Sequence, residues 1–223
     1  WRDQKQKAWT AKDNAGEIYI DDDVLGFMLP NAASNDGSNK KGSCDKRRGV
    51  LEVTRAISLT PFVGDITFNA RSGAKTNTSL YGSEVHATRY QYGFALTPTF
   101  LRKPEHALDT VDAIVALSGV GGNHSRFLYD FSPDSVVFRW TNDFSPRMLY
   151  GFAMEPNGIV TIPKLIEKVK AGDIQADELI LGGTITKTLS LEEKDILKGA
   201  TFCSGIVQAG EKIKEIMQND LAS

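Results

Sequence analysis

Hydrophobic and polar residues alternate along two parts of the first half of the chain, which is the spacing of β-strands. VLEVTRAISL, residues 50–59, alternates and is rich in β-branched side chains, and Pro61 follows it. Alternation begins again in DITFNA, residues 65–70, and resumes in EVHATRYQYGFAL, residues 84–96. The intervening RSGAKTNTSLYGS, residues 71–83, contains no acid and is rich in Gly, Ser and Thr. Two alternating arms around a polar tip predict a long β-hairpin.

Four helices are predicted in the second half by apolar residues at helical spacing and by signals at the helix ends. Two of them begin at a proline and stop before a glycine, as helix ends favour. Ser190 and Glu193 have the spacing of a capping box, which predicts a third helix over 191–198. A fourth, amphipathic helix ends the chain. The signals are Pro104 and Gly119, then Pro163 and Gly172, and for the last helix Ile206, Ile213, Ile216, Met217 and Leu221.

Further strands are predicted between these helices. The runs are 134–140, 147–154 and 178–189, and a glycine turn leads into another strand within 120–131. We expect one more strand ahead of Trp1, in a segment that precedes the sequence as given. The order of elements then matches the split β-α-β-β-α-β pattern of ferredoxin-like folds, which RNA-recognition modules share with many unrelated domains. The sequence therefore predicts a single α+β domain.

The composition is that of an ordinary globular protein, with 41% hydrophobic and 24% charged residues. No apolar stretch is long enough to cross a bilayer, and the polar start shows no signal peptide. Cys44 and Cys203 lack the paired spacing of a zinc site and fit a reducing cytoplasm. Acids 21–23 cannot all face one ion from a strand, which predicts a solvated acidic turn. We expect a cytoplasmic protein without metal, cofactor or membrane partner.

Basic residues concentrate between residues 37 and 103, although the whole chain carries a net charge of −2. Eleven basic and four acidic residues lie in this block (11 − 4 = +7), so the rest of the chain carries −2 − 7 = −9. NAASNDGSNKKGSCDKRRG, residues 31–49, has the composition of a long, mobile loop, and its length indicates function or disorder. Such a block can form an anion-binding surface, and an ordinary solvated surface is the alternative.

Two conventional kinds of site find little support in the sequence. GVGGNHS, residues 119–125, lacks the lysine of a P-loop and follows a helix. Its backbone N–H groups could still hold a phosphate or sugar, with a tight structural turn as the alternative. His86 or His124 could act as a general acid or base beside Asp65, because histidine titrates near neutrality. Neither histidine has a second catalytic group at a spacing typical of an active site. This favours a role for the histidines in hydrogen bonding or stacking.

Flat rings occupy one face of the strand predicted over 84–96, because alternate residues of a strand point the same way. Base stacking on aromatic rings contributes roughly 1–3 kcal/mol per base. Arginine and lysine add phosphate contacts without sequence preference. Packing of the rings into the core is the alternative, especially for Tyr92 and Phe94. Arg89 lies on the opposite face, and the face with the rings consists of Glu84, His86, Thr88, Tyr90, Tyr92 and Phe94.

Three longer motifs resemble a known family. They are RRGVLEVTRAISLTPFVGDITFNARSG from residue 47, EVHATRYQYGFALTP from residue 84 and GGNHSRFLYDFSPDSVVFRWT from residue 121. Together they look like the DevR-type backbone subunit of type I-B CRISPR effector complexes (Cascade), which is Cas family number seven of the RAMP superfamily. The similarity is closest from about Arg47 to Thr141. Family members begin with a strand and a helix, of which WRDQ matches only the tail.

The resemblance implies a ferredoxin-like, RNA-recognition-type palm over 1–30, 50–64 and 91–223. It also implies a fingers region at 31–49 and a long β-hairpin thumb at 65–90. Copies of such a subunit form a helical filament along the spacer of the CRISPR guide RNA, with other Cascade subunits as partners. The guide pairs with the target DNA strand, so the subunit itself needs no code for base edges.

The resemblance also implies which residues contact RNA. They come from the basic fingers, the palm strand, the thumb and a glycine-rich loop. The expected contacts are Lys40, Lys41, Lys46, Arg47 and Arg48; Arg55 and Thr60; Arg71, Ser72, Lys75, Thr76, His86, Thr88, Arg89 and Tyr90; and Gly121, Gly122, Asn123, His124, Ser125 and Arg126.

Two alternatives to a non-catalytic scaffold stay open at this point. The first is an RNA endonuclease of the same superfamily that uses Asp65 or His86, since related backbone subunits of type III complexes cut RNA through an aspartate. The second is a CRISPR-linked transcriptional regulator, which an older name of the family suggests. No helix-turn-helix pattern supports the regulator. The family's type I members recruit a separate nuclease, which favours a chain that is not an enzyme.

Overall fold

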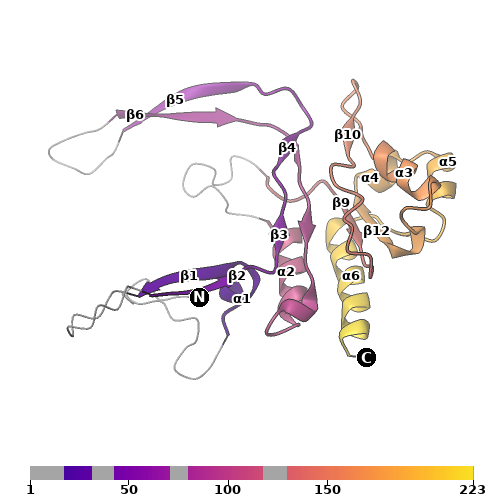
Figure 1. Ribbon diagram of the computed structural model, residues 1–223. Coiled ribbons are helices and arrows are strands. Elements are labelled where there is room, and N and C mark those ends of the chain that lie inside the picture. The colour runs from indigo at the N-terminus through magenta and orange to yellow at the C-terminus, as the bar shows by residue number, and fades with distance from the viewer. Residues whose placement is uncertain (1–17, 32–42, 71–79, 118–129, 223) are drawn as a thin grey trace, which may run out of the picture.

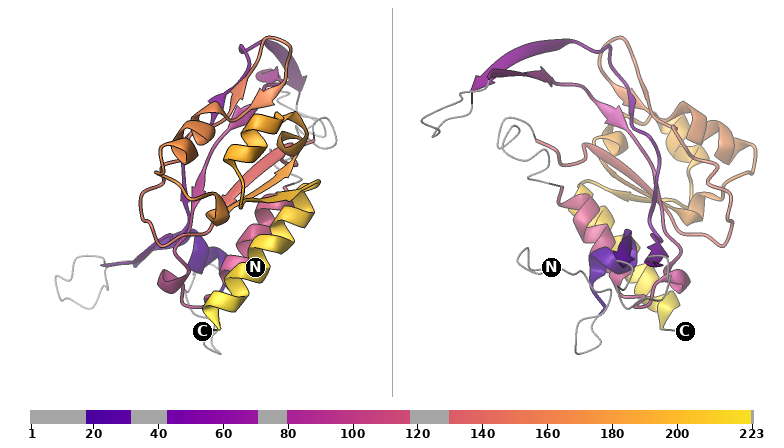
Figure 2. Two further views of the ribbon diagram at one scale, coloured as in Figure 1. Left: turned by 90° about the vertical axis from the view of Figure 1, so that its right-hand side faces the viewer. Right: turned by 60° about the vertical axis from the view of Figure 1, so that its left-hand side comes forward.

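The structure is a computed structural model that describes residues 18–31, 43–70, 80–117 and 130–222 (Figure 1). It consists of a body that contains most of the helices and of two extensions that are built from paired strands. We call the longer extension, residues 52–70 and 80–95, the arm. It curves away from the body, with the pair of β5 (Gly64–Ala70) and β6 (Leu80–His86) at its far end (Figure 2).

A three-stranded sheet lies at the centre of the body. Its strands are β9 (Ser135–Arg139), β12 (Leu179–Gly183) and β13 (Thr201–Cys203), in the order β13-β12-β9. β12 pairs antiparallel with β9 and parallel with β13. Predicted strands at 134–140 and at the start of 178–189 are therefore confirmed.

Helices cover both faces of this sheet, so the body has three layers (Figure 1). Leu179 and Leu181 of β12 point into one hydrophobic cluster and Ile180 into the other, because alternate residues of a strand point to opposite sides. The helices α2 (His106–Val115) and α6 (Ile206–Leu221) cover the Ile180 side, and α3 (Pro163–Lys170), α4 (Ile185–Thr188) and α5 (Leu191–Ile196) cover the other.

The packing of α6 against β12 depends on glycine. A Cβ at Gly182 would lie 2.5 Å from the Cβ of Ala209 and 3.1 Å from the carbonyl oxygen of Gly205. Gly183 has a φ of +83°, which ends the strand in a conformation that side chains disfavour. The strand predicted over 178–189 is therefore wrong beyond this point, where α4 follows.

The helices agree with the sequence pattern. α3, α5 and α6 lie within two residues of the bounds that the sequence predicted for them, and α2 begins two residues after Pro104 and ends at Val115, three residues before the predicted end. Ser190 accepts a hydrogen bond from the Glu193 N–H at 3.2 Å, and the Glu193 carboxylate accepts from the Ser190 N–H at 2.8 Å, so the capping box is confirmed.

The arm contains three consecutive antiparallel strand pairs. At its far end β5 (Gly64–Ala70) pairs with β6 (Leu80–His86), and the predicted hairpin is thus confirmed. The continuous strands predicted over 50–59 and 84–96 are wrong. Hydrogen bonding is interrupted there, which leaves β3 (Glu52–Val53) with β8 (Phe94–Ala95), and β4 (Ile57–Ser58) with β7 (Tyr90–Gln91).

A side chain accounts for one of these interruptions. The Gly93 N–H donates to Thr54 Oγ1 at 2.8 Å, while the Thr54 N–H donates to the Gly93 carbonyl oxygen at 2.9 Å. The threonine hydroxyl thus replaces a backbone acceptor between β3 and β4, as local side-chain hydrogen bonds can do.

Part of the predicted fingers loop is a strand. β2 (Ser43–Arg48) pairs antiparallel with β1 (Gly26–Asn31), so the prediction of one loop over 31–49 is wrong for residue 31 and residues 43–48. The polar composition of β2 gave no signal of a strand, because β2 forms through its pairing with GFMLPN of β1. We call β1 and β2 the basic ribbon.

The region 147–154 also differs from its prediction. Only Ala153–Met154 (β10) is a strand, paired with Val160–Thr161 (β11). Arg147 and Tyr150 have φ values of +42° and +54°, which interrupt an extended backbone.

The remaining elements are short: α1 (Ile20–Val24), η1 (Pro98–Phe100) and η3 (Ala176–Glu178). The described chain is a mixed α+β protein, while the finer ferredoxin-like arrangement stays a prediction. Among the described residues, no helix combines the length and hydrophobicity that crossing a membrane requires.

Candidate nucleic-acid interface

The basic ribbon separates its cations onto two faces. Neighbouring residues of a strand point to opposite sides, so Lys46 and Arg48 share one face of β2 and Arg47 lies on the other. Lys46 is exposed, and the Arg48 side chain is 86% exposed and pairs with Glu52. The Arg47 side chain is only 21% exposed. Lys46 and Arg48 therefore present positive charge to solvent from one surface.

Arg47 turns towards the body. Its Nη2 donates to Asp23 Oδ1 at 2.7 Å and to the carbonyl oxygen of Phe100 at 3.0 Å. Because these two bonds hold Nη2 against the body, Arg47 contributes to the structure of the protein, and the RNA contact expected of it stays a prediction.

Asp23 is the centre of this contact. The N–H groups of Arg102 and Lys103 donate to its carboxylate at 3.0 to 3.1 Å, and His106 Nδ1 lies 3.0 Å from Oδ2. Burial alone would raise the pKa of the carboxyl, but these backbone donors, His106 and Arg47 together hold the pKa of Asp23 below its ordinary value. An ionised carboxylate only accepts hydrogen bonds, so His106 donates from Nδ1.

The acidic turn predicted at residues 21–23 is therefore wrong, since these residues form part of a helix, and of the three only Asp21 is exposed. Asp22 is 3% exposed and Asp23 is fully buried at 0%, within α1. The sequence pattern failed because the donors for Asp23 come from residues about 80 positions further along the chain.

We call the part of the arm around β4 and β7, residues 54–63 and 86–93, its bend, and the cations Arg55 and Arg89 lie there. The Arg55 side chain is exposed, and its carbonyl oxygen accepts a hydrogen bond from the Tyr150 hydroxyl at 3.0 Å. The Arg89 N–H donates to Thr60 Oγ1 at 3.4 Å, which brings these two predicted contacts together. Arg89 Nε lies 3.8 Å from a carboxylate oxygen of Asp134, and both side chains are more than half exposed. Such an exposed pair leaves Arg89 available to a stronger anionic partner.

Aromatic rings gather at the same bend. The ring of His86 lies 5.0 Å from that of Phe62 and 6.2 Å from that of Tyr90, and His86 Nδ1 is 3.0 Å from Thr88 Oγ1. A second ring pair, Tyr92 with Phe94, is 5.3 Å apart. The interrupted ladder means that these rings form two small groups and not the single row that alternation predicted.

The register of the hairpin argues against a shared role for the two catalytic candidates. Asp65 is opposite Val85 and Gly64 is opposite His86, so the side chains of Asp65 and His86 point to opposite faces. The Asp65 carboxylate accepts the Ile66 N–H at 2.8 Å. Among the described residues, no group of three or more His, Cys, Asp and Glu side chains could hold a metal ion. The two residues cannot act as an acid–base pair on one atom.

Twelve of the expected RNA contacts lie outside the described residues, so their positions stay predictions. These are Lys40, Lys41, Arg71, Ser72, Lys75, Thr76, Gly121, Gly122, Asn123, His124, Ser125 and Arg126.

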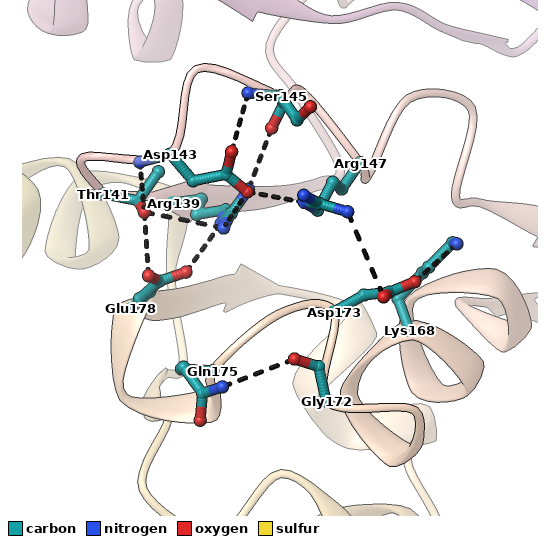
Figure 3. A network of polar contacts seen from close by, with 10 residues as sticks. All are labelled: Arg139, Thr141, Asp143, Ser145, Arg147, Lys168, Gly172, Asp173, Gln175 and Glu178. Atoms are coloured by element: carbon teal, nitrogen blue, oxygen red, sulfur yellow. Dashed lines mark hydrogen bonds and ion pairs between the residues drawn. The ribbon is translucent and has the colours of Figure 1, made fainter.

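The body contains a second polar network that the sequence did not indicate (Figure 3). Arg139, whose side chain is 5% exposed, donates to Glu178 at 2.7 Å, to Asp143 at 3.3 Å and to the Ser145 carbonyl oxygen at 3.1 Å. Arg147 also donates to Asp143, at 2.5 Å, and lowers the pKa of that carboxyl to about 2. The network fixes the loop between β9 and β10 to the body.

Comparison with known proteins adds one close relative. No family model matches the chain. The chain is 48% identical over 220 aligned residues to CRISPR-associated protein Cas7/Cst2/DevR of Myxococcus xanthus (strain DK1622), which covers 94% of this chain and 71% of the relative. This chain belongs to the Cas7/Cst2/DevR family. The resemblance found in the three motifs is thus confirmed, while the type I-B subtype stays a prediction.

Membership of the Cas7/Cst2/DevR family makes the chain CRISPR-associated and gives the exposed cations a context. In this family member, Lys46 and Arg48 lie on the basic ribbon, and Arg55 and Arg89 lie near the bend of the arm. The basic ribbon and the arm, which carry these four cations, both extend from the body (Figure 1).

Proposed function

We propose that this protein is a non-catalytic backbone subunit that binds a CRISPR guide RNA, forms a helical filament along its spacer and presents it for pairing with target DNA. The observation that carries the proposal is the exposed cationic face of β2, where Lys46 and Arg48 point away from the body. Cations on a strand of fixed position can bind the phosphate backbone of RNA, and such contacts do not depend on the RNA sequence.

In this proposal residues 1–30, 50–64 and 91–223 form a ferredoxin-like palm. Residues 31–49, which include β2, form the fingers, and residues 65–90 form the thumb. Arg55, Thr60, Arg89 and the rings at the bend contact the RNA. The subunit works in the cytoplasm with other Cascade proteins, and the type I-B subtype is part of the proposal.

The far end of the arm supports self-association. Ile66 and Phe68 of β5 and Leu80 of β6 share one face of the hairpin, and each is more than 60% exposed. A two-stranded hairpin is marginally stable alone, and contiguous exposed apolar residues mark interaction sites. A neighbouring copy of the protein on the same RNA would cover this face.

RNA binding as a function of salt tests the proposal. We expect tight binding of the full chain to single-stranded RNA, a steep fall in affinity as salt rises, and regularly spaced copies along longer RNA. Electron microscopy of the complex on RNA of several lengths measures the spacing. Binding that ignores salt, or particles that stay single on long RNA, would contradict it.

Incubation of the assembled complex with complementary RNA and a divalent metal tests the alternative enzyme. We expect intact RNA. Cleavage at regular spacing that disappears in Asp65→Ala or His86→Ala would replace the scaffold with an endonuclease.

A further inference from the structure

Asp23 joins three segments that are far apart in the sequence. It lies in α1, its Oδ1 accepts from Arg47 of β2 at 2.7 Å, and its carboxylate accepts from the N–H groups of Arg102 and Lys103 at 3.0 to 3.1 Å. His106, at the start of α2, approaches Oδ2 at 3.0 Å. A fully buried charge with this many donors is fixed in place, because each donor compensates its desolvation.

The contact with Arg47 sets which way β2 faces. Strand geometry places Arg47 on one side and Lys46 and Arg48 on the other, so a bond that holds Arg47 against the body turns the other two outwards. Backbone bonds hold the base of the basic ribbon, among them those from the Val50 and Leu51 N–H groups to the Val24 carbonyl oxygen. The Arg47 side chain adds a second point of attachment on the ribbon itself.

We propose that Asp23 is a positioning residue for polyanion binding: it holds Arg47 against the body and thereby aims Lys46 and Arg48 at the phosphates of an RNA. This inference rests on the proposed function. It gives Arg47 a role distinct from that of its two neighbours, although all three are cations in one KRR run.

Whether Asp23→Asn weakens or strengthens RNA binding distinguishes a positioning role of Asp23 from a simple effect of its charge. Asp23 carries a negative charge, so its removal by Asp23→Asn makes the protein less repulsive to RNA. Charge alone therefore predicts equal or tighter binding by the variant. Positioning predicts the opposite, because Arg47 loses its ion pair with Asp23, the ribbon turns more freely and the two phosphate contacts are lost.

The main experiment measures RNA affinity against salt for the wild type, Asp23→Asn, the double variant Lys46→Ala/Arg48→Ala and the combined triple variant. Loss of two phosphate contacts on single-stranded RNA makes the log–log salt slope shallower by about 1.4, which is about a tenfold loss of affinity near 0.15 M salt. We expect this loss in Asp23→Asn and in the double variant. The triple variant should lose no more than either, because all remove the same contacts.

Glu178→Gln is the matched control. It also removes one negative charge and also breaks the ion pair of an arginine that is largely buried, Arg139, but in the network of the other half of the body. We expect RNA affinity within about twofold of the wild type and an unchanged slope. An equal loss in both single variants would show general destabilisation and overturn the inference.

A spin label on Cys44 reports the ribbon without RNA. Cys44 is exposed on β2, and Cys203 is buried, so one thiol of the folded chain reacts. We expect a more mobile label in Asp23→Asn and an unchanged label in Glu178→Gln. A wild type that fails to bind RNA would overturn the proposed function, whereas an equally rigid label in Asp23→Asn would overturn the positioning role.

If Asp23→Asn does not fold, Arg47→Met decides the question, since it leaves Asp23 its backbone donors and His106. In the Lys46→Ala/Arg48→Ala background, a positioning Arg47 adds no further loss. An Arg47 that touches phosphate itself would make the salt slope shallower by a further amount of about 0.7, and this result would overturn the inference.

Discussion

Leu179, Ile180 and Leu181 in the body are buried on both faces of the sheet, whereas Ile66 and Phe68 in the arm lie exposed on one face of a hairpin. Helices cover both sides of the body's sheet, and no described element covers the exposed face of the arm (Figures 1 and 2). The same kind of side chain thus stabilises the fold in one region and is available to a partner in the other. Stability and interaction are separated along the chain.

The largest effect is expected in the body. Leu181 is 0% exposed and packs among α3, α4 and α5, so Leu181→Ala leaves a cavity there. We expect the free energy of unfolding to fall by about 2–5 kcal/mol, measured by chemical denaturation. A loss below about 1 kcal/mol would show that this cluster is not the core of the fold, and the contrast with the arm would disappear.

A smaller effect is expected where the arm joins the body. Gln91 Nε2 donates to the Phe152 carbonyl oxygen at 3.0 Å, and the Phe152 N–H donates to Gln91 Oε1 at 3.1 Å. Gln91→Ala removes both bonds and should lower the free energy of unfolding by about 1–3 kcal/mol. It should also weaken RNA binding, since the arm loses its attachment.

Gln175→Ala is the control for this junction. The Gln175 side-chain amide donates to the Gly172 carbonyl oxygen over a long 3.4 Å, on the surface of the body (Figure 3). We expect both stability and RNA binding to stay close to the wild type. If Gln91→Ala behaved like this control, the arm would be held by other contacts.

The polar network of the body predicts a dependence on acid. Hydrogen bonding with Arg147 lowers the pKa of Asp143 to about 2, against about 3.9 in an unfolded chain. A lowered pKa adds stability above the unfolded value, and that stability is lost as pH falls from about 4 to about 2. In thermal melts between about pH 4 and pH 2, the melting temperature of Asp143→Asn should fall less than that of the wild type. Identical profiles would show that the ion pair adds nothing.

The sequence predicted those elements whose signals are local. The capping box at Ser190, the proline and glycine at the ends of α3, and the alternation of β5 all describe contacts within a few residues. The sequence also predicted the family, because long motifs in a fixed order can be recognised without knowing the fold.

Elements that depend on distant partners could not be predicted. The strand SCDKRR forms only because GFMLPN lies beside it, and Asp23 is buried only because residues 102 to 106 surround its carboxylate. The prediction of one row of rings over 84–96 was wrong because it assumed a continuous strand. Side chains alternate strictly only in an uninterrupted ladder of backbone hydrogen bonds, and the Thr54 hydroxyl interrupts this ladder.

The smallest effect on stability is expected at the far end of the arm. A small effect there, against the large one in the body, would best show that the two regions differ. Phe68 is 78% exposed, so Phe68→Ser should change the free energy of unfolding by less than about 0.5 kcal/mol. Its expected effect is on assembly: fewer copies per RNA and lower cooperativity, seen by sedimentation. Phe144→Ser, at an exposed phenylalanine of the body, is the control and should change neither quantity. Unaltered assembly in Phe68→Ser would mean that copies meet through another surface, because an apolar contact that excludes water cannot tolerate a hydroxyl at its centre.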